Sequence, residues 1–141
     1  MGLSKLDTDA KLENEGVPVV VHTDTNAEGE EYDVRIVVKR AGGENKRYLK
    51  AKNDAFKVHQ RQLRLGQFSD ERFTKILQGV YSRHVVTSWE NVDLDGEMVE
   101  CTPENVLAVF IRYPVVWEAV LEVSQSAEIY REDVEESVKN S

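Results

Sequence analysis

The chain has 141 residues, 40% of them hydrophobic and 31% charged, which is the composition of one folded domain with a modest core. It contains no apolar run long enough to span a bilayer, and its polar N-terminus lacks the apolar segment of a secretory signal, so we expect a soluble cytoplasmic protein. The single Cys101 excludes an internal disulfide and a cysteine-rich metal site.

The net charge of −8 is distributed unevenly along the chain. Residues 1–34 carry nine acids and two bases, whereas residues 35–64 carry ten bases and two acids. Residues 89–141 are again acidic, with thirteen acids and three bases. A basic middle between acidic flanks predicts electrostatic contacts, either with a partner or within the protein itself.

The N-terminal part predicts a leader and then a β-hairpin. Residues 1–16 are polar, lack a sustained hydrophobic period and are expected to form a flexible leader. Val17–Thr23 is rich in β-branched residues, which favours a strand. Apolar and polar residues alternate from Tyr32 to Lys39, the pattern of a half-buried strand. The acidic segment 24–31 would be the loop of the hairpin.

Two helices are predicted in the middle of the chain. The first follows Asn45, a good N-cap residue, and ends with Arg64 in its last turn and Gly66 just beyond it. The second begins after Ser69, and its apolar residues recur at offsets of three and four as far as Val85.

Two more helices are predicted near the C-terminus. Asp95-Gly96 predicts a tight turn, and Thr102-Pro103-Glu104 combines an N-cap, a first-turn proline and an acid. Pro114 ends the third helix and begins the fourth. We therefore expect a mostly α-helical α+β fold with an N-terminal β-hairpin followed by about four helices. Residues 17–130 would form the single globular domain, and residues 131–141 an acidic, frayed tail.

No pattern typical of catalysis is found. His22, His59 and His84 share no metal-ligand spacing, and acidic neighbours of Cys101 would raise its thiol pKa. Asn91–Gly96 resembles the opening of an EF-hand loop, but Thr102 stands where the loop needs its bidentate acid, so a turn is favoured over calcium. We expect no catalytic, metal-binding or cofactor-binding residues, and no enzyme activity.

Two groups of residues are candidates for binding a partner. The basic group could dock an acidic protein or nucleic acid, or pair with the acidic flanks of its own chain or of a second copy in a homo-oligomer. Nucleic acid is the weaker alternative, because the acidic flanks would oppose phosphate. The aromatic group belongs mainly to the core, and some of its members could contact a partner. The candidates are Lys39, Arg40, Lys46, Arg47, Lys50, Arg61, Trp89, Phe110, Tyr113 and Trp117.

The order of several short motifs resembles one family. A strand ends in Arg40-Ala41-Gly42-Gly43-Glu44-Asn45 and leads into a basic helix. Val86–Val92 contains a tryptophan, and Asp95-Gly96 and Cys101-Thr102-Pro103-Glu104-Asn105 follow it. An aliphatic helix, Tyr113-Pro114 and a further helix complete the series. Over about residues 33–130 this order resembles the tail assembly chaperones of long-tailed, siphovirus-type bacteriophages.

The resemblance implies a function without a cofactor or a reaction. Such chaperones bind the tape measure protein in the host cytoplasm, keep it soluble and help recruit tail tube protein during tail morphogenesis. The leader, residues 1–16, has no counterpart in that family. The mostly helical core of the family does not require the hairpin. The alternatives are a structural tail or neck subunit of the virion and a nucleic-acid-binding protein that uses the basic helix.

Overall fold

The computed structural model describes residues 2–131. The predicted acidic tail, residues 131–141, therefore lies outside the described residues except for Arg131. The expected architecture, an N-terminal β-hairpin followed by about four helices, is wrong. The described part of the chain is an α+β fold with six α-helices and two sheets, and its first elements are helical.

The chain begins with two short helices where the leader was predicted. They are the 3-10 helix η1, Gly2–Leu6, and the α-helix α1, Ala10–Glu15. Asp9 caps α1 by accepting a hydrogen bond from the Lys11 backbone amide. A helix of six residues has no stretch long enough for a hydrophobic period to be recognised, and α1 depends on contacts with distant parts of the chain.

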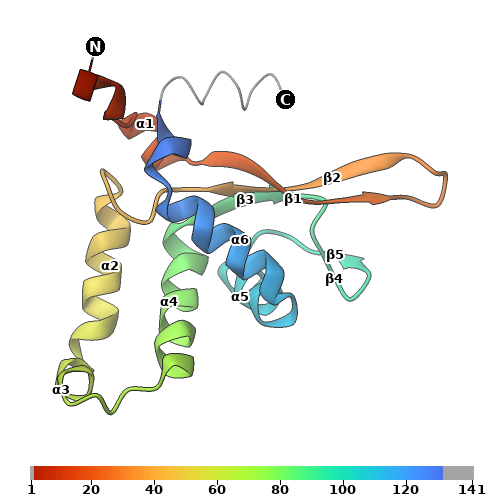
Figure 1. The fold of residues 1–141 in the computed structure, drawn as a ribbon. Helices are drawn as coiled ribbons and strands as arrows, with labels where there is room; N and C mark the ends of the chain where they lie inside the picture. The colour runs from red at the N-terminus through yellow and green to blue at the C-terminus, as the bar shows by residue number, and fades with distance from the viewer. Residues whose placement is uncertain (1, 132–141) are drawn as a thin grey trace.

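Three antiparallel strands form the main sheet in the order β1-β2-β3. The strands β1, Val17–Thr25, and β2, Glu31–Val38, form the predicted hairpin, and β3, Val86–Glu90, was not predicted. The β3 strand pairs only with Arg35–Val38, so the far half of the hairpin has no third strand beside it. Figure 1 shows this half extending beyond the helices.

The remaining helices follow the predicted caps. Asn45, Ser69 and Thr102 each accept a hydrogen bond from a backbone amide in the first turn of the helix that they precede. The predicted helix up to Arg64 is divided at Val58 and His59, which lets Leu63 fold back against the core. The helices are α2 (Lys46–Lys57), α3 (Gln60–Arg64), α4 (Asp70–His84), α5 (Pro103–Arg112) and α6 (Pro114–Gln125), followed by the 3-10 helix η2 (Ala127–Tyr130).

A second, two-stranded sheet contains the predicted Asp-Gly turn. Its strands are β4, Asp93–Leu94, and β5, Glu97–Met98. Asp95 and Gly96 between them have φ angles of 51° and 90°. Positive angles at both central residues are typical of the type I′ hairpin turn, which confirms the prediction.

The core lies between the helices and the main sheet. Helix α4 is its centre, because it contacts α2, α5 and β3, and α6 contacts β2. Tyr81 of α4 is fully buried and contacts Tyr48 and Trp117 through edge-to-face ring packing at centroid distances of 5.6 and 4.9 Å. Its hydroxyl group is hydrogen-bonded to the Ser124 hydroxyl at 2.7 Å.

A smaller apolar cluster joins the two ends of the described chain. It contains Leu12 of α1, Val17 of β1 and Tyr130 of η2. The Tyr130 hydroxyl donates to the Val38 carbonyl at 2.9 Å, and the Tyr130 backbone carbonyl accepts a hydrogen bond from the Asp9 amide at 2.7 Å. These contacts hold both short terminal helices against the end of the main sheet.

A buried ion pair fastens α1 to the loop after β2. The Glu13 side chain is fully buried, contacts the Arg40 guanidinium and accepts a hydrogen bond from the Thr8 hydroxyl at 2.8 Å. Gly43 lies so close that a Cβ atom there would collide with the Glu13 carboxylate. Its φ angle of +54° also favours glycine, so both the backbone conformation and the packing at this position require a residue without a Cβ atom.

No helix among residues 2–131 is long and apolar enough to cross a membrane.

Candidate protein-interaction surfaces

The three histidines lie in different parts of the fold. His22 is on β1, His59 lies between α2 and α3, and His84 ends α4. His59 contacts the Phe68 ring at a centroid distance of 5.1 Å. Burial raises the pKa of the Cys101 thiol, which disfavours the reactive thiolate. Within residues 2–131, no three His, Cys, Asp or Glu side chains are grouped to hold a metal ion.

The loop that resembles an EF-hand has a different use in the fold. The Asp93 carboxylate accepts a hydrogen bond from the Gly96 amide at 3.0 Å, and Asp95 pairs with Arg112 at 2.8 Å. The Tyr113 hydroxyl accepts from the Asp95 amide at 3.2 Å. The acids therefore stabilise the turn and attach it to the end of α5.

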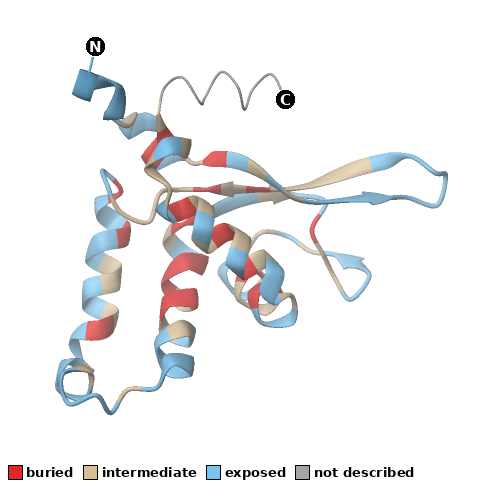
Figure 2. Cartoon of the chain, in the orientation of Figure 1, coloured by how far each residue is buried: buried red, intermediate tan, exposed pale blue. Residues whose placement is uncertain are grey.

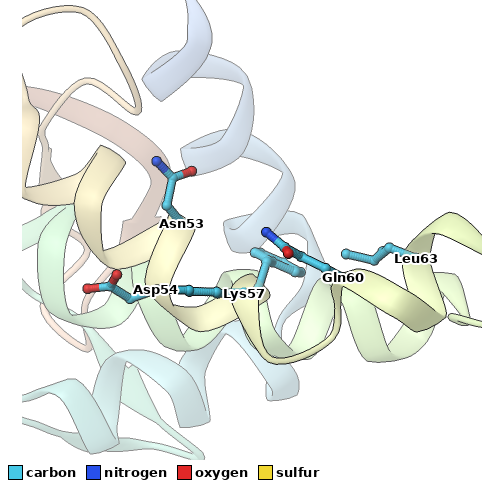
Figure 3. Close-up of a pocket in the computed structure, with 6 residues that line it drawn as sticks. Asn53, Asp54, Lys57, Gln60 and Leu63 are labelled. Carbon is cyan, nitrogen blue, oxygen red and sulfur yellow. The ribbon is translucent and has the colours of Figure 1, made fainter.

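A mixed polar hollow lies where α2 meets α3. Figure 3 shows Asn53, Asp54 and Lys57 from α2 together with Gln60 and Leu63 from α3. Asp54 already pairs with Lys50 at 2.9 Å on the same helix. The hollow brings together no pair of acids and no nucleophile with a base, so it offers no catalytic geometry.

A more apolar groove of about 400 Å³ lies between α4 and the α5–α6 corner. Asp70, Glu71, Thr74, Lys75 and Gln78 form its α4 wall, and Phe110, Ile111, Pro114 and Trp117 form the other. The first set recurs at offsets of three and four, so it is one face of α4. The second set is apolar throughout, and the Ile111 side chain is 63% exposed. Such a surface suits an apolar side chain of a partner better than a polar substrate.

The four predicted aromatic residues have different environments. Phe110 and Trp117 are buried, their ring centroids are 5.0 Å apart, and they form the inner part of the groove. Trp89 is half-buried, and its indole N–H donates to the Val99 carbonyl at 2.9 Å. Tyr113 is half-buried beneath the Arg112 guanidinium. Only the first two line the groove between α4 and the α5–α6 corner.

The predicted basic residues also divide into different environments. Arg40 is engaged in the ion pair with Glu13, and Lys50 pairs with Asp54. Lys46 is exposed on α2 with Glu44 4.0 Å away, and Arg61 is exposed on α3.

Lys39 and Arg47 belong to a cluster that sequence reasoning did not identify. The Lys39 amide donates to the Val85 carbonyl at 2.7 Å, and Asn45, just before α2, donates to the His84 carbonyl at 3.2 Å, so these residues meet the end of α4, which carries Arg83. Burial lowers the pKa of His84, and the charges of Lys39, Arg83 and Arg47 lower it further. None of these three cations makes an ion pair with a residue in the described part of the chain. We call Lys39, Arg47, Arg83 and His84 the basic cluster. Arg83 was missed because it lies nineteen positions beyond Arg64, in a nearly charge-balanced segment.

Comparison with known proteins identifies the family. The family model described as YdaY prophage protein matches residues 43–140, more than half of the chain. The protein belongs to the YdaY prophage protein family. It is thus a phage-derived protein. No curated protein and no solved structure matches the chain.

The match to the YdaY prophage protein family covers one part of the fold. Residues 43–140 include helices α2 to α6 and the small sheet, and hence the groove between α4 and the α5–α6 corner. They also include Arg47, Arg83 and His84 of the basic cluster. The helices η1 and α1 and the β1–β2 hairpin lie before the matched residues.

Proposed function

We propose that this phage-derived protein is a tail assembly chaperone. In this proposal it binds the tape measure protein, keeps it soluble and helps recruit tail tube protein during assembly in the host cytoplasm. The order of the Trp89, Asp95-Gly96 and Thr102-Pro103-Glu104 motifs supports it, and so does membership of a prophage family.

The observation that carries the proposal is the apolar groove between α4 and the α5–α6 corner. An amphipathic helix can place its apolar side chains into a groove of this kind, with anchors at helical spacing. Ile111 stands exposed at the groove, and Phe110 and Trp117 provide a rigid inner surface. A long helical client would present many suitable segments, and no chemistry is required of the chaperone.

The test is co-expression with the tape measure protein of the same prophage. The chain should raise the soluble yield of that protein, and Ile111→Asp should abolish the gain, because a carboxylate cannot be buried in an apolar contact. The matched control is Val58→Asp, which places the same charge at a residue that is 79% exposed and lies outside the groove.

The outcomes separate the proposal from its main rival. An unchanged yield with the wild-type chain would contradict chaperone function. Equal effects of the two aspartate variants would show that the groove is not the client site. A structural tail or neck subunit would instead be found in purified particles in fixed proportion to the other tail proteins.

A further inference from the structure

The β1–β2 hairpin forms an arm that projects from the body of the protein. β1 and β2 pair from Val17–Val38 to Thr25–Glu31, while β3 covers β2 only as far as Arg35. The arm therefore continues for four residues past the last three-stranded position, ~13 Å at the usual strand rise. Figure 2 shows that its outer part is mostly exposed. This length exceeds the screening length of about 8 Å at physiological salt, so charges at its end act separately from the body.

The end of the arm is strongly acidic. We define the arm tip as residues 24–31, which carry Asp24, Glu28, Glu30 and Glu31 and no lysine or arginine. Within residues 2–131, no lysine or arginine forms an ion pair with these four acids, and the His22 ring lies 3.9 Å from the Asp24 carboxylate. Asp33, one step further in, is already neutralised by Arg35 at 3.0 Å. The free negative charge is thus concentrated at the tip.

The basic cluster is the complementary feature on the body. Lys39 follows β2, Arg47 lies in the first turn of α2, and Arg83 lies in the last turn of α4. The Lys39 amide donates to the Val85 carbonyl at 2.7 Å and the Asn45 side chain donates to the His84 carbonyl at 3.2 Å, so the ends of these three elements meet. Like charges at close range disfavour the folded state, and no acid within residues 2–131 forms an ion pair with these three. Such an arrangement favours an acidic partner.

The two features cannot meet within one molecule. Figure 1 shows the arm extending away from α2 and α4, and Lys39 is at the base of the strand whose other end is the tip. Contact between them therefore requires two molecules. Because the two surfaces differ, this contact is heterologous and can repeat from one copy to the next.

We propose that the arm tip of one copy docks on the basic cluster of a second copy, so that the protein self-associates head to tail. The partner is identified by charge. The tip supplies carboxylates at the end of a narrow two-stranded arm, and the cluster supplies guanidinium and ammonium groups that form no ion pair within residues 2–131. Duplex DNA fits less well, because the acidic flanks of the chain, net charge −8, would repel its phosphates. This inference does not depend on the proposed chaperone function.

The first experiment is sedimentation velocity over a concentration series at two salt concentrations. The average mass should rise with protein concentration at about 50 mM NaCl, and the dissociation constant should increase at least ~10-fold at about 300 mM NaCl, because exposed charge pairs are screened. A monomer at every concentration in low salt would overturn the proposal. Self-association with the same dissociation constant at both salt concentrations would overturn it as well.

Charge-reversal variants then test the two surfaces. Glu28→Lys with Glu30→Lys reverses the tip, and Arg47→Glu with Arg83→Glu reverses the cluster. Each pair alone should abolish self-association. An equimolar mixture of the two variants should associate again, because each then offers a surface complementary to the other. All four substitutions in one chain should also restore it, at the wild-type net charge of −8.

A matched control excludes an effect of net charge. Glu118→Lys with Glu122→Lys makes the same change in charge on the exposed side of α6 and should leave self-association intact. Loss of association in this control, or failure of the mixture to associate, would overturn the assigned contact. Circular dichroism of each variant verifies that it is folded. Binding of duplex DNA by a monomeric wild-type chain would assign the cluster to nucleic acid instead.

Discussion

Replacing Glu13 by alanine should destabilise the protein strongly, although α1 is only six residues long. The Glu13 side chain is fully buried, whereas its partner Arg40 is 21% exposed. Removing one member of a buried pair typically costs 3–5 kcal/mol, because the other charge is left without compensation. Arg40 can recruit some water, so we expect the lower end of this range, about 3 kcal/mol, with the lost Thr8 hydrogen bond included.

The assay is urea unfolding followed by circular dichroism. Glu15→Ala is the control, because Glu15 is exposed on the same helix and should change the free energy of unfolding by less than about 0.5 kcal/mol. Glu13→Gln keeps the volume of the side chain and some hydrogen bonding, and should cost roughly 1–2 kcal/mol. If Glu13→Ala cost no more than Glu15→Ala, the ion pair would not hold α1 to the loop after β2.

A double-mutant cycle with Arg40→Ala separates the pair from the rest of the contacts. Removing both residues leaves no uncompensated charge, so the double variant should lose at least ~1 kcal/mol less than the sum of the single variants. Additive losses would show that Glu13 and Arg40 stabilise the fold independently.

Two further predictions concern stability at other sites. Burial raises the pKa of Tyr48, Tyr81 and Tyr130 above the usual phenol value of about 10. Above pH ~10 the tyrosines of the unfolded chain release protons that the folded chain keeps, so the free energy of unfolding should fall as the pH rises. Urea unfolding at a series of pH values measures this, and a free energy that did not change with pH would contradict the prediction. Gly79→Ala, in α4 with open space at its Cβ, should raise the free energy of unfolding by about 0.5–1 kcal/mol. Gly96→Ala should lower the free energy of unfolding by about 1 kcal/mol, because a Cβ atom there would also meet open space but the φ angle of +90° is unfavourable for alanine. Equal changes in the two alanine variants would refute this explanation from backbone conformation.

The parts of the fold that sequence predicted are those encoded locally. Asn45, Ser69 and Thr102 cap their helices through hydrogen bonds within three residues, so each signal lies beside its consequence. The Asp95-Gly96 turn is local in the same sense, because the two residues themselves adopt the positive φ angles that it needs.

The parts that sequence reasoning missed depend on distant residues. Helix α1 is held by Arg40 and Tyr130, which lie 27 positions after Glu13 and far along the chain from Asp9. Strand β3 has exposed Thr87 and Ser88 in its middle and is defined by pairing with β2, roughly fifty residues earlier. Neither pattern differs from that of a loop when it is considered alone.

The candidate surfaces show the same division. The density of basic residues between Lys39 and Arg64 is visible in the sequence, but it does not reveal which charges remain free. In the fold Arg40 is neutralised by Glu13 and Lys50 by Asp54, and neither is fully available to a partner. The charges that matter for association are those left after internal pairing, and they must be found in three dimensions.

The geometry of the hairpin explains why the acidic N-terminal flank and the basic middle of the chain neutralise each other only in part. Asp33 and Arg35 pair on the arm, so the opposite signs cancel where the segments adjoin. The hairpin then carries its acidic turn away from the body (Figure 1), while Lys39, just after β2, meets the end of α4 through the hydrogen bond from its amide to the Val85 carbonyl. The two-stranded arm thus separates the acidic tip from Lys39 and Arg47, which follow it closely in the sequence. A flexible segment of the same composition would let the tip and the cluster meet within one chain. The length of the paired strands keeps them apart, and shortening the arm should therefore weaken association between copies even if every charge were kept.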